Sequence, residues 1–194
     1  GGASLLEAVL RETDLSQANL RGALLRRAIL VQANLREANL QEADLKGADL
    51  ESADLYRADL FKANLEDVDL QDANLDQPDL RKAILVKADM RGANLFRARM
   101  QGADLSEADL YRADLEKSDL RDANLYKADL RESNLHGVNL QGANLQGADL
   151  EGANLFEADL TEANLEGLSL ERTNLESAKF LKTIMPDGHS HTRQ

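Results

Sequence analysis

The sequence predicts an all-β solenoid, a chain that winds into a coil with one corner every five residues. Two observations predict this fold. A leucine occupies nearly every fifth position from residue 5 to residue 185, with 33 leucines among the 37 positions of the series. Alanine stands two residues earlier in 28 of the 37 repeats, and Asp or Asn stands one residue earlier, also in 28. The repeat therefore reads Ala, Asp or Asn, Leu, and two variable residues.

A period of five fits neither an α-helix nor a continuous strand. On a helix each step of five rotates the leucine by roughly 140°, so the leucines would cover every face. In an extended strand successive leucines would point to opposite faces of the sheet, because five is an odd number. A corner in each repeat resets the inward direction, so that every Leu and every Ala can point into one shared bore.

Successive turns of such a coil stack about 4.8 Å apart and pair through their backbones. Burial of each Leu contributes roughly 1.5 to 3 kcal/mol, which offsets the entropy of ordering the chain without aromatic bulk. Ala suits the second inward position because the bore is narrow. We expect Asp and Asn at the corner, where short polar side chains bond nearby backbone groups. Pro78 and Leu168 fit the Ala position poorly, and we expect a local irregularity at Pro78.

The repeat, as in Ala148-Asp149-Leu150-Glu151-Gly152, closely resembles the motif A(D/N)LXX of the pentapeptide-repeat family over nearly the whole chain. The ending "FLKTIMPDG" is similar to the close of cyanobacterial members. The resemblance implies a right-handed quadrilateral parallel β-helix with four pentapeptides per turn. About nine turns would then form a rod roughly 45 Å long.

We expect residues 1–185 to form one continuous solenoid and residues 186–194 to form a mobile tail. The stretch "RRAILVQANLREANL" at 26–40 is echoed by "RKAILVKADMRGANL" at 81–95. This echo indicates two related segments with a joint near residues 75–100, produced either by duplication or by fusion. The five-residue register runs through the joint without a break.

Both ends of a coil expose leucines and unpaired backbone, so both need covers. A hydrophobic lid is predicted at the C-terminal end, made of Phe180, Leu181, Ile184 and Met185. The cover at the other end is thin, and we expect a monomer or weak end-to-end self-association. The absence of Cys and of a long apolar run favours the cytoplasm and no membrane contact. The opening "GGAS" lacks an initiator Met and leaves room for a removed targeting segment.

With four repeats per turn, residues twenty apart stack on one face. One face is expected to carry an aspartate ladder of Asp49, Asp69, Asp89, Asp109, Asp129 and Asp149. These carboxylates could hold cations or present a negative stripe to a basic partner. We favour the simpler interpretation, in which the repeat requires Asp or Asn at this position and nearby Lys and Arg screen the charges.

A second face is expected to carry an aromatic row of Tyr56, Phe96 and Phe156, together with His136. A protein partner could use such a row as anchors, although scattered surface aromatics are the simpler interpretation. A basic belt is predicted to run around a full turn, and therefore not to form one nucleic-acid face. It consists of Arg81, Lys82, Lys87, Arg91, Arg97 and Arg99.

No catalytic constellation appears in the sequence. There is no Cys nucleophile and no phosphate-binding loop motif, and the only histidines are His136, His189 and His191. A packed bore also offers no pocket that could desolvate a pair of carboxylates and separate their pKa values. We therefore expect no enzymatic activity, no cofactor and no metal.

Two functions remain, and the favoured one is a non-enzymatic rod that an unknown protein partner recognises, without direct nucleic-acid binding. The alternative is DNA mimicry, since some proteins of the resembled family occupy the DNA groove of a topoisomerase. The net charge of -12 amounts to one charge per about 4 Å of rod, whereas duplex DNA carries one per about 1.7 Å. Mimicry would belong to the acidic stretch from Glu132 to Glu171, which holds eight acidic residues and no Lys or Arg. The C-terminal helix that pairs such mimics has no counterpart in this sequence.

Overall fold

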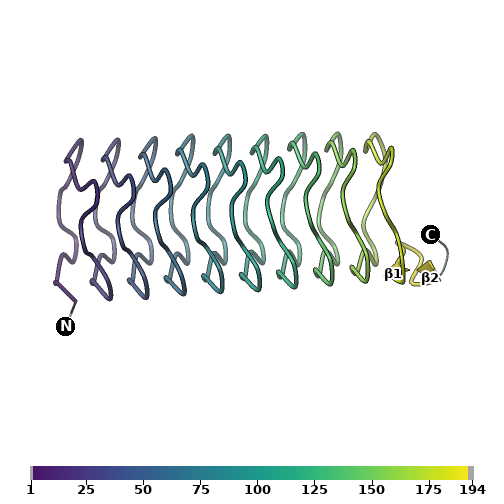
Figure 1. Cartoon of the computed structure of the whole chain (residues 1–194), viewed down its shortest axis with the longest axis horizontal. Helices are drawn as coiled ribbons and strands as arrows, with labels where there is room; N and C mark the ends of the chain where they lie inside the picture. Colours follow the sequence, from purple (N-terminus) through teal and green to yellow (C-terminus); the bar gives the residue numbers. More distant parts are fainter. Residues whose placement is uncertain (1, 192–194) are drawn as a thin grey trace.

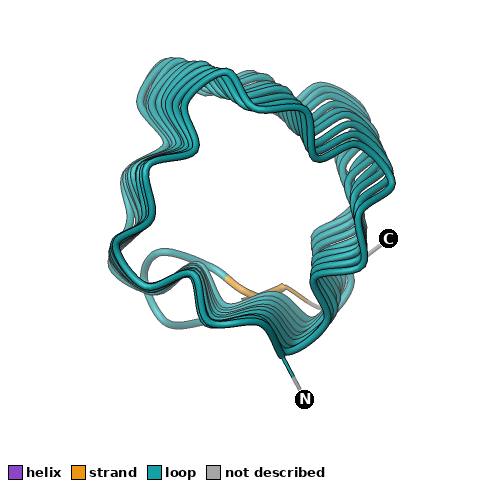
Figure 2. Ribbon diagram, turned by 90° about the vertical axis from the view of Figure 1, so that its left-hand side faces the viewer, coloured by secondary structure: helices purple, strands orange, loops and turns teal. Residues whose placement is uncertain are grey.

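In the computed structural model, which describes residues 2–191, the chain forms a straight rod of stacked turns without any helix in that range (Figure 1). Viewed along its axis, the rod has a four-sided outline in which the turns superpose (Figure 2). Every isolated bridge between turns is parallel and joins a residue to the one twenty positions later, as in Val9↔Ile29 and Asn164↔Ile184. Four repeats therefore make one turn, and the predicted all-β quadrilateral β-helix is confirmed.

The two variable residues of each repeat form the corner. The carbonyl of the inward Leu accepts a hydrogen bond from the N–H three residues later, as from Ala28 to Leu25 at 3.0 Å. From Glu7 to Lys182 the second variable residue always has positive φ, with values from 53° at Glu7 to 75° at Gly167. This is the pattern of a type II turn. Positive φ costs a residue other than glycine roughly 1 kcal/mol or more, so the bonds on both sides must hold the corner in place.

The Asp or Asn of the repeat lies in the middle of a side, and the prediction that it forms the corner was wrong. It is the bridging residue, and its Oδ1 accepts a hydrogen bond from the N–H two residues later in all 28 repeats that carry it. A regular repeat has four further backbone N–H groups. Three of them donate to carbonyls of neighbouring turns, and the fourth, that of Ala, donates to the Leu carbonyl across the corner. The side chain thus supplies the one acceptor that the backbone lacks.

Leucine and alanine side chains, which Figure 2 does not draw, fill the space that the ribbon encloses. From Leu25 to Leu165 the inward leucines and the two methionines among them are at most 1% exposed. Hydroxyl groups at the Ala position find backbone acceptors, as when the Ser118 Oγ–H donates to the Leu115 carbonyl at 2.7 Å. The predicted assignment of Leu and Ala to the inside is therefore confirmed.

Two residues at the Ala position disturb the ladder to different degrees. Pro78 removes one corner hydrogen bond, because it has no N–H, yet the bridges from Asp79 to both neighbouring turns remain. Leu168 has the larger effect: within residues 2–191 the series of bridges skips the pair Asp149 and Ser169. A leucine at the place of an alanine overfills the bore and separates the two turns beside it.

A small hairpin lies at the C-terminal end of the rod (Figure 1). Strand β1 (Thr183–Ile184) pairs antiparallel with β2 (Ser190–His191). Phe180 occupies a Leu position and packs against the core, and the Nδ1 atom of His191 lies 3.0 Å from its carbonyl oxygen. Of the predicted lid residues, Ile184 remains 36% exposed.

The expected division of the chain into a solenoid of residues 1–185 and a mobile tail of residues 186–194 stays a prediction. Residues 186–191 form the hairpin turn and β2, while 192–194, which belong to the expected mobile tail, lie outside the described residues. The bridges continue without interruption through residues 75–100, where a joint between two related segments was predicted. No helix within the described residues is long and apolar enough to cross a membrane.

Replacement of Leu110 by Lys is expected to destabilise the rod by at least about 4 kcal/mol, because an unpaired ammonium group would enter an apolar bore that holds no carboxylate. Leu110 is 0% exposed. Tyr126→Ala removes an outward side chain and is expected to change stability by less than about 1 kcal/mol. Thermal unfolding followed by circular dichroism measures both, and equal melting shifts would show that the inside and outside assignments are wrong.

The substitution Asp104→Ala is expected to cost about 1 kcal/mol, since it leaves the Ser106 N–H without its acceptor. Asp104 accepts hydrogen bonds from the Ser106 N–H at 3.1 Å and from Asn124 Nδ2 at 2.9 Å. Glu51→Ala is the matched control, because it removes one negative charge from a corner without removing an acceptor of this kind. Urea denaturation compares the two variants, and an equal loss of stability would contradict the capping role.

Candidate functional site

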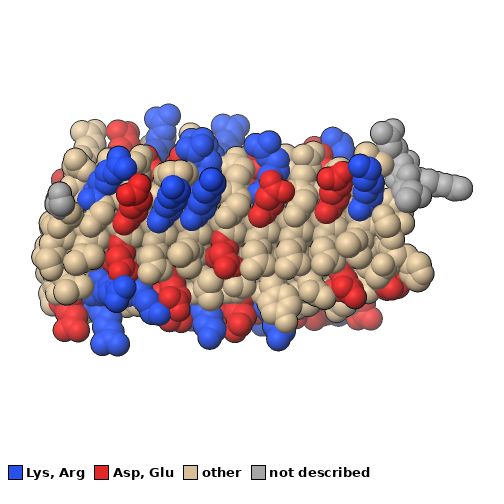
Figure 3. Space-filling view, turned by 90° about the horizontal axis from the view of Figure 1, so that it is seen from below, with Lys and Arg blue, Asp and Glu red and all other residues tan. Residues whose placement is uncertain are grey.

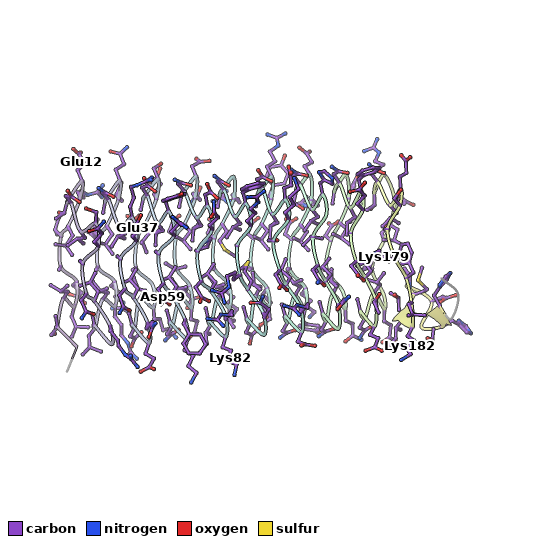
Figure 4. The ribbon with its side chains drawn as sticks, viewed as in Figure 1. Glu12, Glu37, Asp59, Lys82, Lys179 and Lys182 are labelled. Atoms are coloured by element: carbon purple, nitrogen blue, oxygen red, sulfur yellow. The ribbon has the colours of Figure 1, made fainter. Side chains whose placement is uncertain are left out.

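The outer faces carry the charged and aromatic side chains of the rod, because the bore is filled by apolar ones. Figure 4 shows labelled side chains such as Glu12 and Lys82 pointing away from the coil. Each repeat presents three outward positions: the bridging residue and the two corner residues. Residues with the same position in successive turns form columns with a spacing of twenty residues. A candidate site is therefore a group of columns, and its members are distant in sequence.

The aspartate ladder lies where the sequence predicts it, since bridges join its six members in succession from Asp49 to Asp149. Arginine side chains lie between its rungs. Arg91 is 2.6 Å from Asp89 and 3.6 Å from Asp109, and Arg131 is 2.5 Å from Asp129 and 3.7 Å from Asp149. Four of the six carboxylates are thereby paired, and an arginine occupies two of the five intervals between successive members of the ladder.

Hydrogen bonding in the ladder shifts the pKa values of Asp129 and of the two arginines beside it. The hydrogen bond from the Arg131 side chain lowers the pKa of the Asp129 carboxyl, against the opposing effect of burial. The same contact raises the pKa of the Arg131 guanidinium, and Asp89 does the same for Arg91. Within residues 2–191, no group of three or more His, Asp or Glu side chains is placed to hold a metal ion. The ladder has the chemistry of an ion-paired surface, and its role as a binding stripe stays a prediction.

The aromatic row does lie on one face, but its rings are separated and partly covered. Tyr56 and Phe96 are two turns apart, with Asp76 at the same position of the turn between them. The guanidinium of Arg36 lies 4.2 Å from the centroid of the Tyr56 ring, and that of Arg97 lies 4.9 Å from the centroid of Phe96. These rings support neighbouring cations, and their use as anchors for a partner stays a prediction.

Phe156, the third member of the row, packs against His136. Their ring centroids are 5.4 Å apart, and the two nitrogens of His136 lie 3.7 Å from Glu116 and Glu157. The tail histidines do not join them: His189 lies 3.3 Å from Asp187, and His191 faces the carbonyl of Phe180. His136 thus lies apart from the C-terminal hairpin that carries the other two histidines, and each of the three has different neighbours.

Cations from neighbouring turns pair with much of the acidic stretch between Glu132 and Glu171. Lys or Arg lies within 4.0 Å of five of its carboxylates. These pairs are Arg112–Glu132 at 2.7 Å, Arg131–Asp149 at 3.7 Å, Arg172–Glu151 at 3.0 Å, Lys179–Asp159 at 3.8 Å and Lys182–Glu162 at 2.9 Å. Sequence reasoning missed this neutralisation because the partner cations lie outside the stretch, and a comparison at a spacing of twenty residues would have found most of them.

The basic belt runs around a full turn, as predicted, but the prediction missed a group of cations on one side. Four of its members share one face with two further cations from the preceding turn. We call this group the basic patch, and it consists of Arg57, Lys62, Arg81, Lys82, Arg97 and Arg99. Figure 3 shows basic side chains gathered over the middle of the rod in the upper part of the view.

Two surface hollows lie among these charged columns. One, of about 440 Å³, lies in the basic patch between Arg57, Arg97, Arg99 and Gln77. The other, of about 400 Å³, lies over Gly152, where Arg131, Arg172 and Glu151 are among its walls. The arginines of the second hollow are all ion-paired, whereas Arg57 and Arg97 of the first make no ion pair within residues 2–191.

Comparisons with known proteins identify related chains. The family model of pentapeptide repeats matches residues 3–41, 28–67, 38–77, 73–110, 98–137, 133–167 and 153–186. HetL, a pentapeptide repeat protein involved in heterocyst differentiation regulation from the cyanobacterium Nostoc sp. strain PCC 7120, is 38% identical, with 97% of this chain and 92% of that chain covered and a TM-score of 0.57.

Two further solved structures are similar over part or most of the chain. Full-length QnrB1, a plasmid-mediated fluoroquinolone resistance protein, is 20% identical over 92% of each chain, with a TM-score of 0.50. Rfr23 from the cyanobacterium Cyanothece 51142 is 38% identical over 52% of this chain and 59% of that chain, with a TM-score of 0.30. Comparison with curated protein sequences gives no match.

The ladder pairs predict a pH-dependent difference between wild type and Arg131→Gln. The folded pKa of Asp129 is lowered below its ordinary value near 3.9, so its stabilising contribution is present above that pH and is lost as the pH falls through the folded pKa. Arg131→Gln should therefore lower the melting temperature at pH 7, and this difference should shrink below about pH 3.9. Arg27→Gln, which removes a charge without an ion pair in the described residues, is the control. A difference for Arg131→Gln that is constant with pH would contradict the assignment.

Proposed function

Since the chain belongs to the pentapeptide-repeat family, whose members form right-handed quadrilateral β-helices and are generally structural or interaction modules, we propose that it is a non-enzymatic rod that binds a protein partner. One observation carries the proposal: a packed apolar bore holds charged and aromatic side chains at fixed spacings on an extended outer surface. Solenoids use extended surfaces of this kind for binding. The partner is unknown.

The ionisable groups support a binding role over a catalytic one. All carboxyl groups with a resolved pKa shift in residues 2–191 are shifted downward, which keeps them ionised at neutral pH. A carboxyl group that acts as a general acid requires the opposite shift. We therefore propose no enzymatic activity, cofactor or metal for this chain.

DNA mimicry is the second candidate function, favoured by the net charge of -12. The ion pairs of the acidic stretch weigh against it, because paired carboxylates do not present the uniform negative charge of a DNA backbone. The likeness to QnrB1, at 20% identity, concerns the fold alone. HetL is involved in regulation of differentiation, and a regulatory role exercised through protein binding is compatible with the rod proposed here.

We further propose a cytoplasmic location, no membrane contact and weak end-to-end self-association. The absence of Cys suits a reducing compartment. At the N-terminal end Val9 is 68% exposed and Leu6 is 52% exposed. Within residues 2–191 the first turn bridges only to the second, as in Val9↔Ile29, and an unpaired edge of this kind can pair with a second rod. A sedimentation coefficient that rises with concentration supports this association, and one that stays constant contradicts it.

The experiment that tests the proposed function is affinity capture from an extract of the natural host. Wild type is compared with a variant in which Glu132, Glu151 and Glu162 are each replaced by Gln. A specific partner other than a DNA-binding enzyme supports the interaction rod, and recovery of a topoisomerase that the variant no longer captures favours mimicry. If wild type captures no specific protein, the proposal fails.

We expect no inhibition of DNA supercoiling by gyrase at micromolar concentrations of this chain. The physical reason is the pairing of acidic side chains with Lys and Arg of neighbouring turns, which leaves too little unpaired negative charge for the DNA groove. A gel-based supercoiling assay with purified gyrase measures this. Potent inhibition would reverse the ranking of the two functions.

A further inference from the structure

The basic patch has a charge opposite to that of the protein as a whole. Its six Lys and Arg residues surround three carboxylates, Asp59, Asp76 and Asp79, which leaves a net charge of three positive units on a chain of net charge -12. At about 0.1 M salt the Debye length is about 10 Å, so a ligand on the patch interacts mainly with these local charges. The patch can therefore attract an anionic group to an acidic protein.

Four of the six cations are free to bind a partner. Asp79 is held by Arg81 at 2.6 Å and by Arg99 at 3.1 Å. Within residues 2–191 the other four patch cations make no ion pair: Arg57, Lys62, Lys82 and Arg97. By contrast, most acidic side chains in and beside the aspartate ladder form an ion pair with Lys or Arg. Unpaired arginines that flank one hollow are suited to bind carboxylate oxygens through two parallel hydrogen bonds.

Aromatic rings support the free cations from below. Arg97 lies 4.9 Å from the centroid of Phe96, and Lys62 lies 5.2 Å from the centroid of Phe61. Contacts of this kind reduce the freedom of a long side chain before binding, which lowers the entropy cost of the complex. Arginine next to aromatic side chains is also the composition enriched at protein interfaces.

Acidic residues limit the patch along the rod. The corner columns that contain its cations continue with Glu37 and Glu42 in the preceding turn. In the turn that follows Gly102 they continue with Asp122 and with two cations that are already paired, Lys117 with Glu116 at 2.8 Å and Arg121 with Asp119 at 2.7 Å. The positive region thus covers three turns, which is about 10 Å along the axis. A long nucleic-acid strand would run over these carboxylates, whereas a short acidic peptide fits between them.

We propose that the basic patch binds a short carboxylate-rich segment of a protein partner. Arg57 and Arg97, on either side of the hollow, bind its first carboxylates, and Lys62 and Lys82 add charge at the adjoining corner. This inference rests on the proposed function, because it names the chemistry of the partner that the rod recognises.

The test uses a fluorescent hexaglutamate peptide, with binding measured by fluorescence anisotropy at about 0.1 M salt. Wild type is compared with Arg57→Gln/Arg97→Gln. The control is Arg112→Gln/Arg172→Gln, which changes the net charge equally but removes arginines that already have carboxylate partners. The patch variant is expected to bind at least about tenfold more weakly, and the control to stay within about twofold of wild type. Equal weakening of both variants, or no binding by wild type, overturns the proposal.

Two additional arms distinguish a protein segment from a nucleic acid, and the patch from the rest of the rod. A single-stranded DNA oligonucleotide with six phosphates that binds the patch more tightly than the peptide would overturn the choice of a protein segment. Capture of the same specific host protein by wild type and by Arg57→Gln/Arg97→Gln would overturn the patch while leaving the interaction rod intact. Unchanged melting temperatures of the variants confirm that binding, and not folding, has been altered.

Discussion

The width of the bore is the constraint on which the rest of the structure depends. Each side of the rod contributes one Leu and one small residue to a dry interior, and the leucines of successive turns lie in contact. A second large side chain disturbs this arrangement, since the bridge beside the buried Leu168 is missing within residues 2–191. Because every turn has the same cross-section, the corners superpose along the whole rod, and outward side chains are placed at fixed spacings.

The same constraint determines how the backbone is satisfied. A chain that turns every five residues cannot form long strands, so its hydrogen bonds must be found one repeat at a time. Four N–H groups of a regular repeat bond to carbonyls, and the Asp or Asn side chain takes the fifth. The positive φ at each corner is the cost of this geometry, and residues as different as Glu12, Lys62 and Arg97 all adopt it.

The inside of the rod could be predicted because each inward position is marked by a residue type. The position of the corner could not be predicted, because residues as different as Glu, Lys, Arg and Gln adopt positive φ there. The residue type that is typical of turns, Asp or Asn, instead occupies the bridging position. The four-sided outline was inferred from a resemblance and not from the residues themselves. Pro78 was a weaker disturbance than Leu168, because the bore tolerates the loss of one hydrogen bond better than excess volume.

The sequence predicted where the charged side chains lie on the surface, but it did not predict which of them form ion pairs. A spacing of twenty residues correctly placed the aspartate ladder, yet it did not show that Arg91 and Arg131 lie between its rungs. The basic patch was missed because the belt was read along the sequence, where Arg57 and Lys62 are distant from Arg97. Charge on this rod is organised by columns, and a partner that binds it must recognise residues one and two turns apart.

The most direct test of the shared bore is thermal unfolding, followed by circular dichroism, of two deletions that differ by one residue. Removal of residues 101–120 takes out one full turn and leaves two corner residues, Arg121 and Asp122, between the inward Met100 and Ala123. This variant should keep a β-type spectrum and one cooperative transition. Removal of residues 101–121 leaves one corner residue, too few to make the turn, so later leucines cannot point inward and the cooperative transition should be lost. Similar unfolding of both variants would contradict a bore built from a strict five-residue register.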